Sequence, residues 1–335
     1  MNENPILDAL TQEGVLVNVS VRYWRATRKL KAEDLGLDPN NVTDRLIRLG
    51  HKKLLPQEAL QTFALIESRA HSLVEDCTFP FLNGLGHFLP NRKLAEVTGE
   101  LKKLETEFLE ARLQFLGHYE ELRGQALLDW REAAQKLVPN PERLVNAVYA
   151  AFPTAHALER HFGFDTQLFQ VKSPDHLELS LISLRDQQEI IAARETAALE
   201  ASAKMSRELD QFVSDCVVNL REQTASLCDE MLASIRDAKT GVHQKTLNRL
   251  VRFIDQFKQL NFVGDRQMEE QLERVRQEFL LRSAQEYRDS EFARTQLQQG
   301  LSRLAETARQ LVQENNTELV NRFGELGRRR ICKAA

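Results

Sequence analysis

A long stretch without proline is the feature that most constrains this chain. All nine prolines lie at or before Pro174, and residues 175–335 contain none. Within this stretch Leu, Met, Phe and Val recur at gaps of three and four residues, between Glu, Gln, Arg and Ala, which is typical of long packed helices. We therefore predict a mainly α-helical protein, with a mixed region over 1–174 and a helical region over 175–335.

Two long elements are expected in the helical region, Leu181 to Ala238 and Asp265 to Glu325. Turn-type residues at Thr240 and Gly241, and again at Asn261 to Gly264, separate them from a shorter helix. We expect the long elements to fold back on each other as an antiparallel hairpin, within an elongated helical bundle.

The apolar stripes of these two elements indicate how they pack. The stripe of the first has a mean repeat slightly longer than 3.5 residues, which argues against a simple dimeric coiled coil. In the second, Leu304 and Leu311 lie in the stripe and Asn315 takes the next inward place. A polar residue there can fix the register between helices, and the alternative is that Asn315 faces solvent near a helix end.

A small β element is predicted in the N-terminal region. Val15 to Val21 alternates β-branched residues with others, which indicates a strand. Phe79 to Pro90 forms two apolar arms around an Asn-Gly turn, which predicts a β-hairpin, and Phe162 to Val171 is expected to pair with the early strand. Asn91 to Val138 is predicted as a helix that can kink at Gly117 or Gly124.

Composition limits the classes of protein to which the chain can belong. The net charge is −4, no apolar run approaches the roughly 18 residues needed to cross a bilayer, and Met1 to Thr11 lacks signal-peptide character. The four cysteines form no CxxC pair, which indicates neither a disulfide framework nor a zinc site. We expect a cytoplasmic protein.

A basic patch follows the predicted strand. Arg22 to Lys53 holds nine Lys and Arg against four acids, interleaved with Tyr23 and Trp24, so it is a candidate for phosphate contacts with base stacking. The favoured alternative is that Trp24 lies in the core and the cations are solvated or paired with acids such as Asp34. The candidate patch consists of Arg22, Trp24, Arg25, Arg28, Lys29 and Lys31.

The shorter helix, Gln244 to Val263, is amphipathic and basic. Such a helix is a candidate partner or membrane surface, and the favoured alternative is that its apolar side packs on neighbouring helices. Its apolar side consists of Leu247, Leu250, Val251, Ile254, Phe257 and Leu260.

No catalytic arrangement is evident in the sequence. His156 and His161 lie five residues apart, which does not place both on one helix face for a metal. The Gly-Leu-Gly at Gly84 to Gly86 lacks the third glycine and the strand–helix context of a dinucleotide loop. We therefore expect no enzymatic activity, no metal and no cofactor.

The N-terminal half resembles a family of uncharacterised proteins from bacteria, phages and mobile elements. The resemblance rests on Val17 to Trp24, then Arg28 to Leu30, Glu33 to Gly36 and Leu49 to Lys53, and covers mostly Val15 to Val171. Members are at times encoded beside a MoxR-type AAA+ ATPase and a von Willebrand factor A (VWA) protein similar to cobalt-chelatase subunits. The resemblance implies a component, client or adaptor of that module, and it supplies no catalytic residues.

Three functions remain open at this point. The first is a non-enzymatic helical interaction protein, with an AAA+ ATPase and a VWA protein as expected partners and self-association left open. The second is a membrane-active helical bundle, in which the hairpin opens and the basic helix inserts. The third, which the acidic chain disfavours, is nucleic-acid binding through the basic patch.

Overall fold

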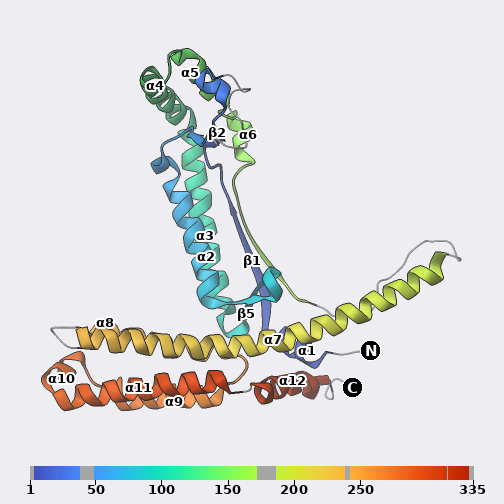
Figure 1. Cartoon of the computed structure of the whole chain (residues 1–335), viewed down its shortest axis with the longest axis vertical. Coiled ribbons are helices and arrows are strands. Elements are labelled where there is room, and N and C mark those ends of the chain that lie inside the picture. The colour runs from blue at the N-terminus through green and yellow to red at the C-terminus, as the bar shows by residue number, and fades with distance from the viewer. Residues whose placement is uncertain (1–3, 38–48, 172–185, 238–241, 315, 332–335) are drawn as a thin grey trace. The chain divides into compact units, whose positions relative to one another are not determined.

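The computed structural model describes residues 4–37, 49–171, 186–237, 242–314 and 316–331 (Figure 1). These residues are mainly helical, with a small antiparallel sheet. They form two compact units. Unit 1 comprises Met1–Val17, Cys77–Ala95 and Leu168–Ala335, and unit 2 comprises Asn18–Asp76 and Glu96–Gln167. Each unit is therefore assembled from segments that are not contiguous in the sequence.

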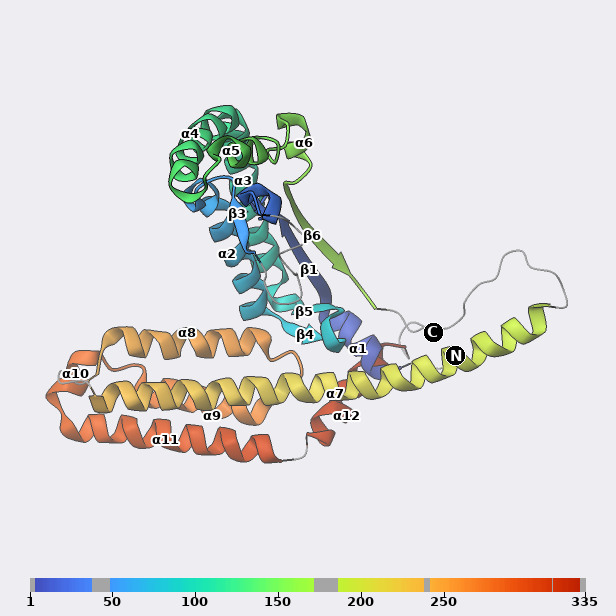
Figure 2. The same cartoon turned by 45° about the horizontal axis from the view of Figure 1, so that its top comes forward.

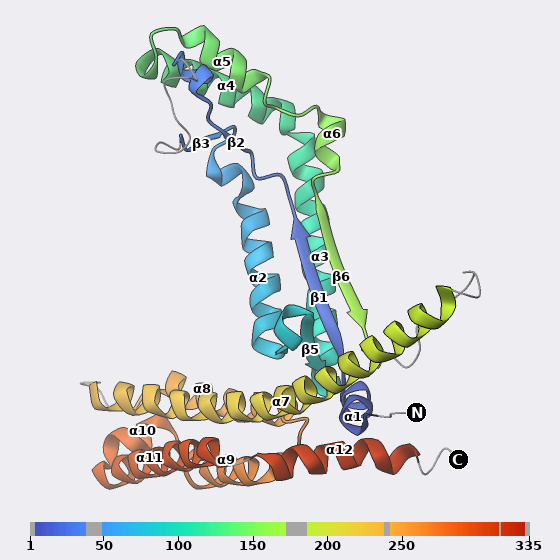
Figure 3. The ribbon, with the colours of Figure 1, turned by 45° about the vertical axis from the view of Figure 1, so that its right-hand side comes forward.

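The sheet has the strand order β4–β5–β1–β6. The strands are β1 (Gly14–Arg22), β4 (Phe79–Phe81), β5 (Gly86–Pro90) and β6 (Gly163–Phe169). In β1, Gly14 lies opposite Pro90 and Val17 opposite His87 of the antiparallel strand β5. Figure 3 shows β1 and β6 side by side. The predicted early strand, the β-hairpin and the pairing of the third segment with the early strand are confirmed.

The hairpin turn is a short 3-10 helix, η4 (Leu82–Gly84), rather than a two-residue turn. Leu82 has a φ of 37°, in the left-handed region that a side chain rarely adopts. At the other end of the hairpin, a side chain at Gly14 would meet Leu89 O at 2.5 Å, so only glycine allows the close approach of β1 and β5.

Unit 1 contains one long helix and six shorter ones in its described part. The long helix is α7 (Asp186–Asp237), and the others are α1 (Pro5–Glu13), α8 (Gln244–Leu260), α9 (Arg266–Phe279), α10 (Ala284–Asp289), α11 (Glu291–Gln313) and α12 (Thr317–Ile331). α7 and α11 run antiparallel (Figures 1 and 2), with Arg309 paired to Asp229. Lys258 of α8 bonds to Glu273 of α9 at 2.6 Å. α1 packs on α12.

The predicted second long element, Asp265 to Glu325, is wrong as a single helix, because the chain breaks into α9, α10, α11 and α12. Ser283 starts α10 with a reciprocal capping box to Glu286, and Ser290 starts α11 by accepting from the backbone of Ala293. Of the first long element, 181–185 and Ala238 lie outside the described residues, as does Asn315.

Most of the described part of unit 2 is built from β2 (Thr27–Lys29), β3 (His51–Lys53), α2 (Gln61–Cys77), α3 (Asn91–Gly117), α4 (Tyr119–Leu137), α5 (Pro141–Tyr149) and α6 (Ala155–Glu159), with η1 (Ala32–Leu35) and η3 (Gln57–Leu60). α2 and α3 extend beyond this unit at one end. The predicted helix over 91–138 breaks after Gly117, one of the two expected kinks, so α4 follows α3.

Each unit has its own apolar core. In unit 2 the core centres on Phe63, whose ring centroid lies 5.0 to 5.8 Å from those of four other aromatic rings, Tyr23, Phe108, Phe115 and Phe162. In unit 1, Phe212 of α7 packs edge-on against Phe81 and Phe88 of the hairpin strands. The hairpin is therefore attached to α7 by aromatic packing.

Candidate functional site

Three residues of the basic patch predicted from the sequence, Arg22, Trp24 and Arg25, have partners within the chain. Trp24 is 5% exposed and packs against Tyr119 and Phe152, so it is a core residue, in agreement with the favoured alternative. Arg22 pairs with Asp165, and Arg25 forms a two-pronged ion pair with Glu67. In this structure no base can stack on Trp24.

The remaining cations of the patch lie on a small antiparallel ribbon. Arg28 and Lys29 of β2 lie opposite Lys52 and His51 of β3, and Lys31 follows β2. Arg28, Lys29, Lys31, His51 and Lys53 are exposed. We call these five side chains the basic ribbon. Its exposed charge is positive, which suits contact with an anionic partner.

Lys52, the one inward-facing cation of β3, has a structural role. Its Nζ lies 2.7 Å from Asp34 Oδ2, and both side chains are less than a tenth exposed. The same carboxylate oxygen accepts from the Lys31 backbone at 3.0 Å. Burial raises the pKa of Asp34, but the hydrogen bonds from Lys52 and Lys31 outweigh it and hold that pKa below its usual value.

The apolar side of α8 is turned inward. Its five residues Leu247, Leu250, Ile254, Phe257 and Leu260 are at most 4% exposed, and Val251 is half-buried. The five belong to the core of unit 1. The apolar side of this helix therefore packs in the core, in agreement with the favoured alternative, and it is not a surface in this structure.

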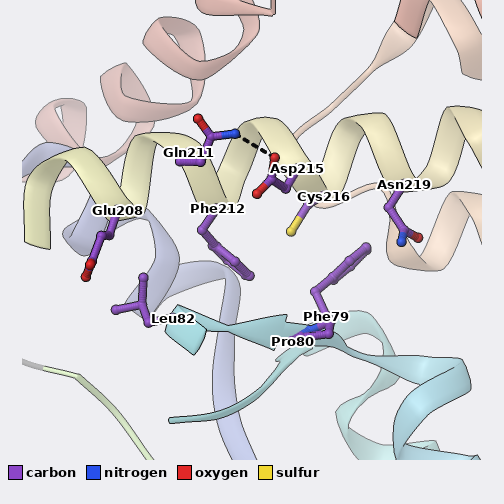
Figure 4. Close-up of a pocket in the computed structure, with 9 residues that line it drawn as sticks. All are labelled: Phe79, Pro80, Leu82, Glu208, Gln211, Phe212, Asp215, Cys216 and Asn219. Carbon is purple, nitrogen blue, oxygen red and sulfur yellow. Dashed lines mark hydrogen bonds between the residues drawn. The ribbon is translucent and has the colours of Figure 1, made fainter. Parts of the chain in front are cut away.

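A groove lies between α7 and the β4–β5 hairpin, within unit 1. Its volume is about 380 Å³, within the range of ligand sites. In Figure 4, Phe212 and Cys216 point from α7 toward the hairpin, while Glu208 and Asn219 lie at opposite ends of the lining residues of α7. We call it the acidic groove, defined by Phe79, Pro80, Leu82, Glu208, Gln211, Phe212, Asp215, Cys216 and Asn219.

The acidic groove combines an apolar floor with a polar wall. Phe79 and Phe212 form the floor and are only 4% and 6% exposed, and Leu82 is half-buried. Gln211 donates a hydrogen bond to Asp215 at 2.7 Å. Burial raises the pKa of Cys216 well above its usual value, so this thiol is protonated and a poor nucleophile at neutral pH. The arrangement suits binding better than covalent chemistry.

A buried polar network that the sequence analysis missed joins four helices of unit 1. Arg221 Nε of α7 lies 2.7 Å from Asp265 Oδ2, and its Nη1 donates to Asn316 and to the carbonyl of Leu311. Asp265 also caps α9 by accepting from Met268. Arg221 and Asp265 are each about 3% exposed, so the network positions the helices, and its residues also line the floor of a pocket of about 390 Å³. A single Arg within a helical stripe gives no local signal in the sequence that such a network exists.

Among the described residues, no three or more His, Cys, Asp or Glu side chains are gathered so that they could hold a metal ion. The same residues contain no helix with both the length and the apolarity to cross a bilayer.

Comparison with known proteins gives one match. No curated protein matches the chain, and no solved structure does. A family model described as protein of unknown function DUF3150 matches residues 11–288, which include β1, the hairpin, the basic ribbon and the acidic groove. The chain therefore belongs to the DUF3150 family.

Proposed function

We propose that this protein is a non-enzymatic helical interaction protein that binds a partner at the acidic groove. The groove is the observation that carries the proposal. It is formed where α7 packs on the hairpin, through Phe212, Phe81 and Phe88, and its wall carries polar side chains. A preformed surface of this kind binds a partner without a large ordering cost.

The resemblance described above suggests the partner. We propose a role as component, client or adaptor of a module with a MoxR-type AAA+ ATPase and a VWA protein. The test is co-purification of the tagged chain with each of these proteins, followed by titration calorimetry on the purified pair. Reversing the groove charge, with Glu208→Arg and Asp215→Arg, should weaken binding, whereas Glu222→Arg, an exposed site on α7 outside the groove, should not. A clean monomer that binds neither protein would contradict the proposal.

Nucleic-acid binding is a second candidate, favoured by the basic ribbon. Its exposed cations can contact phosphates without any base stacking. Binding of a labelled oligonucleotide should then weaken steeply with salt and with Arg28→Glu plus Lys29→Glu. Binding that is indifferent to either change would exclude this candidate.

The membrane-active alternative requires α8 to leave the core. Exposing its five buried side chains would cost roughly 1.5 to 3 kcal/mol each, a total comparable with the stability of a whole domain. It is therefore the weakest of the three proposals. Leakage from anionic vesicles is its test, and a lack of both leakage and flotation would end it.

A further inference from the structure

The length of the acidic groove indicates the shape of its ligand. The lining residues of α7 run from Glu208 to Asn219, three turns of helix, or about 16 Å at 1.5 Å per residue. An extended peptide advances about 3.3 Å per residue, so roughly five residues match this length. A groove of this form fits a chain segment better than a compact small molecule.

The side chains of the groove indicate the chemistry of the ligand. None of the nine described lining residues is Lys, Arg or His, and two of them, Glu208 and Asp215, are carboxylates. Glu208 forms an ion pair with Lys204 of the same helix at 3.7 Å, whereas Asp215 forms no ion pair with another described residue. The groove therefore presents negative charge beside apolar surface, which is complementary to a cation with apolar neighbours.

The edge of the sheet indicates how a peptide would be held. β4 is an edge strand of three residues, and Pro80 at its centre has no backbone N–H. Addition of a peptide strand to β4 would lack a central hydrogen bond, so recognition must come mainly from side chains. The amides of Gln211 and Asn219 can donate to and accept from a peptide backbone, while the carboxylates take its cations.

We propose that the acidic groove binds an extended segment of about five residues, from a partner protein, in which Lys or Arg alternates with apolar side chains. The apolar side chains pack mainly on the half-buried Leu82, above the rings of Phe79 and Phe212, and the cations reach Glu208 and Asp215. This inference rests on the proposed role as an interaction protein, because it names the feature of the partner that the groove recognises.

The test uses the whole chain and a fluorescein-labelled peptide, Gly-Ser-Leu-Lys-Leu-Arg-Leu-Ser-Gly, followed by fluorescence anisotropy. The wild-type chain should bind it with a micromolar Kd and should not bind the peptide in which Glu and Gln replace Lys and Arg. Glu208→Gln with Asp215→Asn should weaken binding about three- to tenfold, the range for losing two exposed ion pairs. Glu222→Gln, on the same helix outside the groove, is the matched control and should change nothing.

Two further measurements keep the result decisive. Circular dichroism should show both variants melting within about 2 °C of the wild type, because all three changes replace exposed or half-buried carboxylates with amides of the same shape. Raising the salt concentration should weaken peptide binding to the wild type, because exposed ion pairs are screened. Salt dependence tests the charge complementarity even without a variant.

The outcomes separate this inference from the proposed function. Absence of saturable binding, equal affinity for both peptides, or binding unchanged in the double variant would overturn the inference. If the ATPase or the VWA protein still co-purifies with the chain in that case, the interaction role stands and only the groove assignment falls. If the peptide binds as expected while neither protein co-purifies, the groove assignment stands and the module assignment falls.

Discussion

Charged side chains buried in each unit are held by partners that are distant in sequence. Arg221 meets Asp265 in unit 1, and Lys52 meets Asp34 in unit 2. A buried ion pair contributes little net stability compared with apolar residues of the same size, but removing one partner leaves a costly unpaired charge. These pairs therefore fix which segments lie together.

The Lys52–Asp34 pair gives the first prediction. Lys52→Met leaves the Asp34 carboxylate buried without its cation, so the free energy of unfolding should fall by about 3 to 5 kcal/mol. Lys53→Met, at the exposed neighbouring position, should change it by less than about 0.5 kcal/mol. Urea denaturation of both variants checks this, and equal effects would show that the buried pair is not formed.

The same carboxylate predicts a dependence of stability on pH. The pKa of Asp34 is lower in the folded chain than in the unfolded chain, where it is about 3.9. Its contribution is therefore fully present above that value and is lost as pH falls through the folded pKa. The difference in unfolding free energy between wild type and Asp34→Asn should shrink below about pH 4. A difference that stays constant from pH 7 to pH 3 would contradict the assignment.

At the scale of elements, periodic patterns predicted the strands and the orientation of α8. The alternation in β1 and the apolar side of α8 are local signals, because each reports which residues of one element face the core. Helix ends were harder to predict. The breaks at Ser283 and Ser290 depend on single capping side chains inside an otherwise continuous stripe. These helix starts can be predicted only from the capping side chains themselves, because the apolar stripe continues across both breaks.

Neither the acidic groove nor the buried polar networks could have been predicted from local patterns in the sequence. The groove joins Phe79 of the hairpin to Phe212 of α7, and the network joins Arg221 to Asp265 and Asn316. Each depends on tertiary packing between residues far apart in the chain. The sequence shows the apolar residues but not which element they face.

Packing between α9 and α11 predicts an unusual glycine substitution. A Cβ at Gly300 of α11 would lie 2.3 Å from the ring of Phe279, so Gly300→Ala should destabilise by about 1 to 3 kcal/mol although alanine favours helix. Gly99→Ala, in α3 with no atom within 4 Å, should instead stabilise by about 0.5 to 1 kcal/mol. Thermal unfolding of the two variants measures the contrast, and shifts of the same sign would contradict the packing.

The contact between α7 and α11 carries a second prediction at this scale. Leu304 and Leu311 of α11 are at most 3% exposed, so shortening either to Ala should cost about 2 to 5 kcal/mol. Gln313→Ala, at an exposed position of the same helix, should stay within about 0.5 kcal/mol. If denaturant unfolding finds Leu304→Ala no worse than Gln313→Ala, the stripe does not face a core.

At the scale of the whole molecule, the chain passes between the two units four times. All four passages fall inside continuous elements, β1, α2, α3 and β6. Cooperative units of unfolding follow packed cores rather than chain continuity. The aromatic core around Phe63 lies in unit 2, and the large apolar cluster that contains Leu304 lies in unit 1.

The two cores therefore predict that damage to one unit spreads little to the other. Phe63→Ala removes the centre of the unit 2 core and should cost about 3 to 5 kcal/mol. Hydrogen exchange followed by mass spectrometry should show faster exchange in α2, while amides of α11 keep their protection. Leu304→Ala should give the reverse, and Gln61→Ala, at an exposed site on α2, should alter neither. Equal acceleration of α2 and α11 by Phe63→Ala would mean that the four passages couple the units into one cooperative structure.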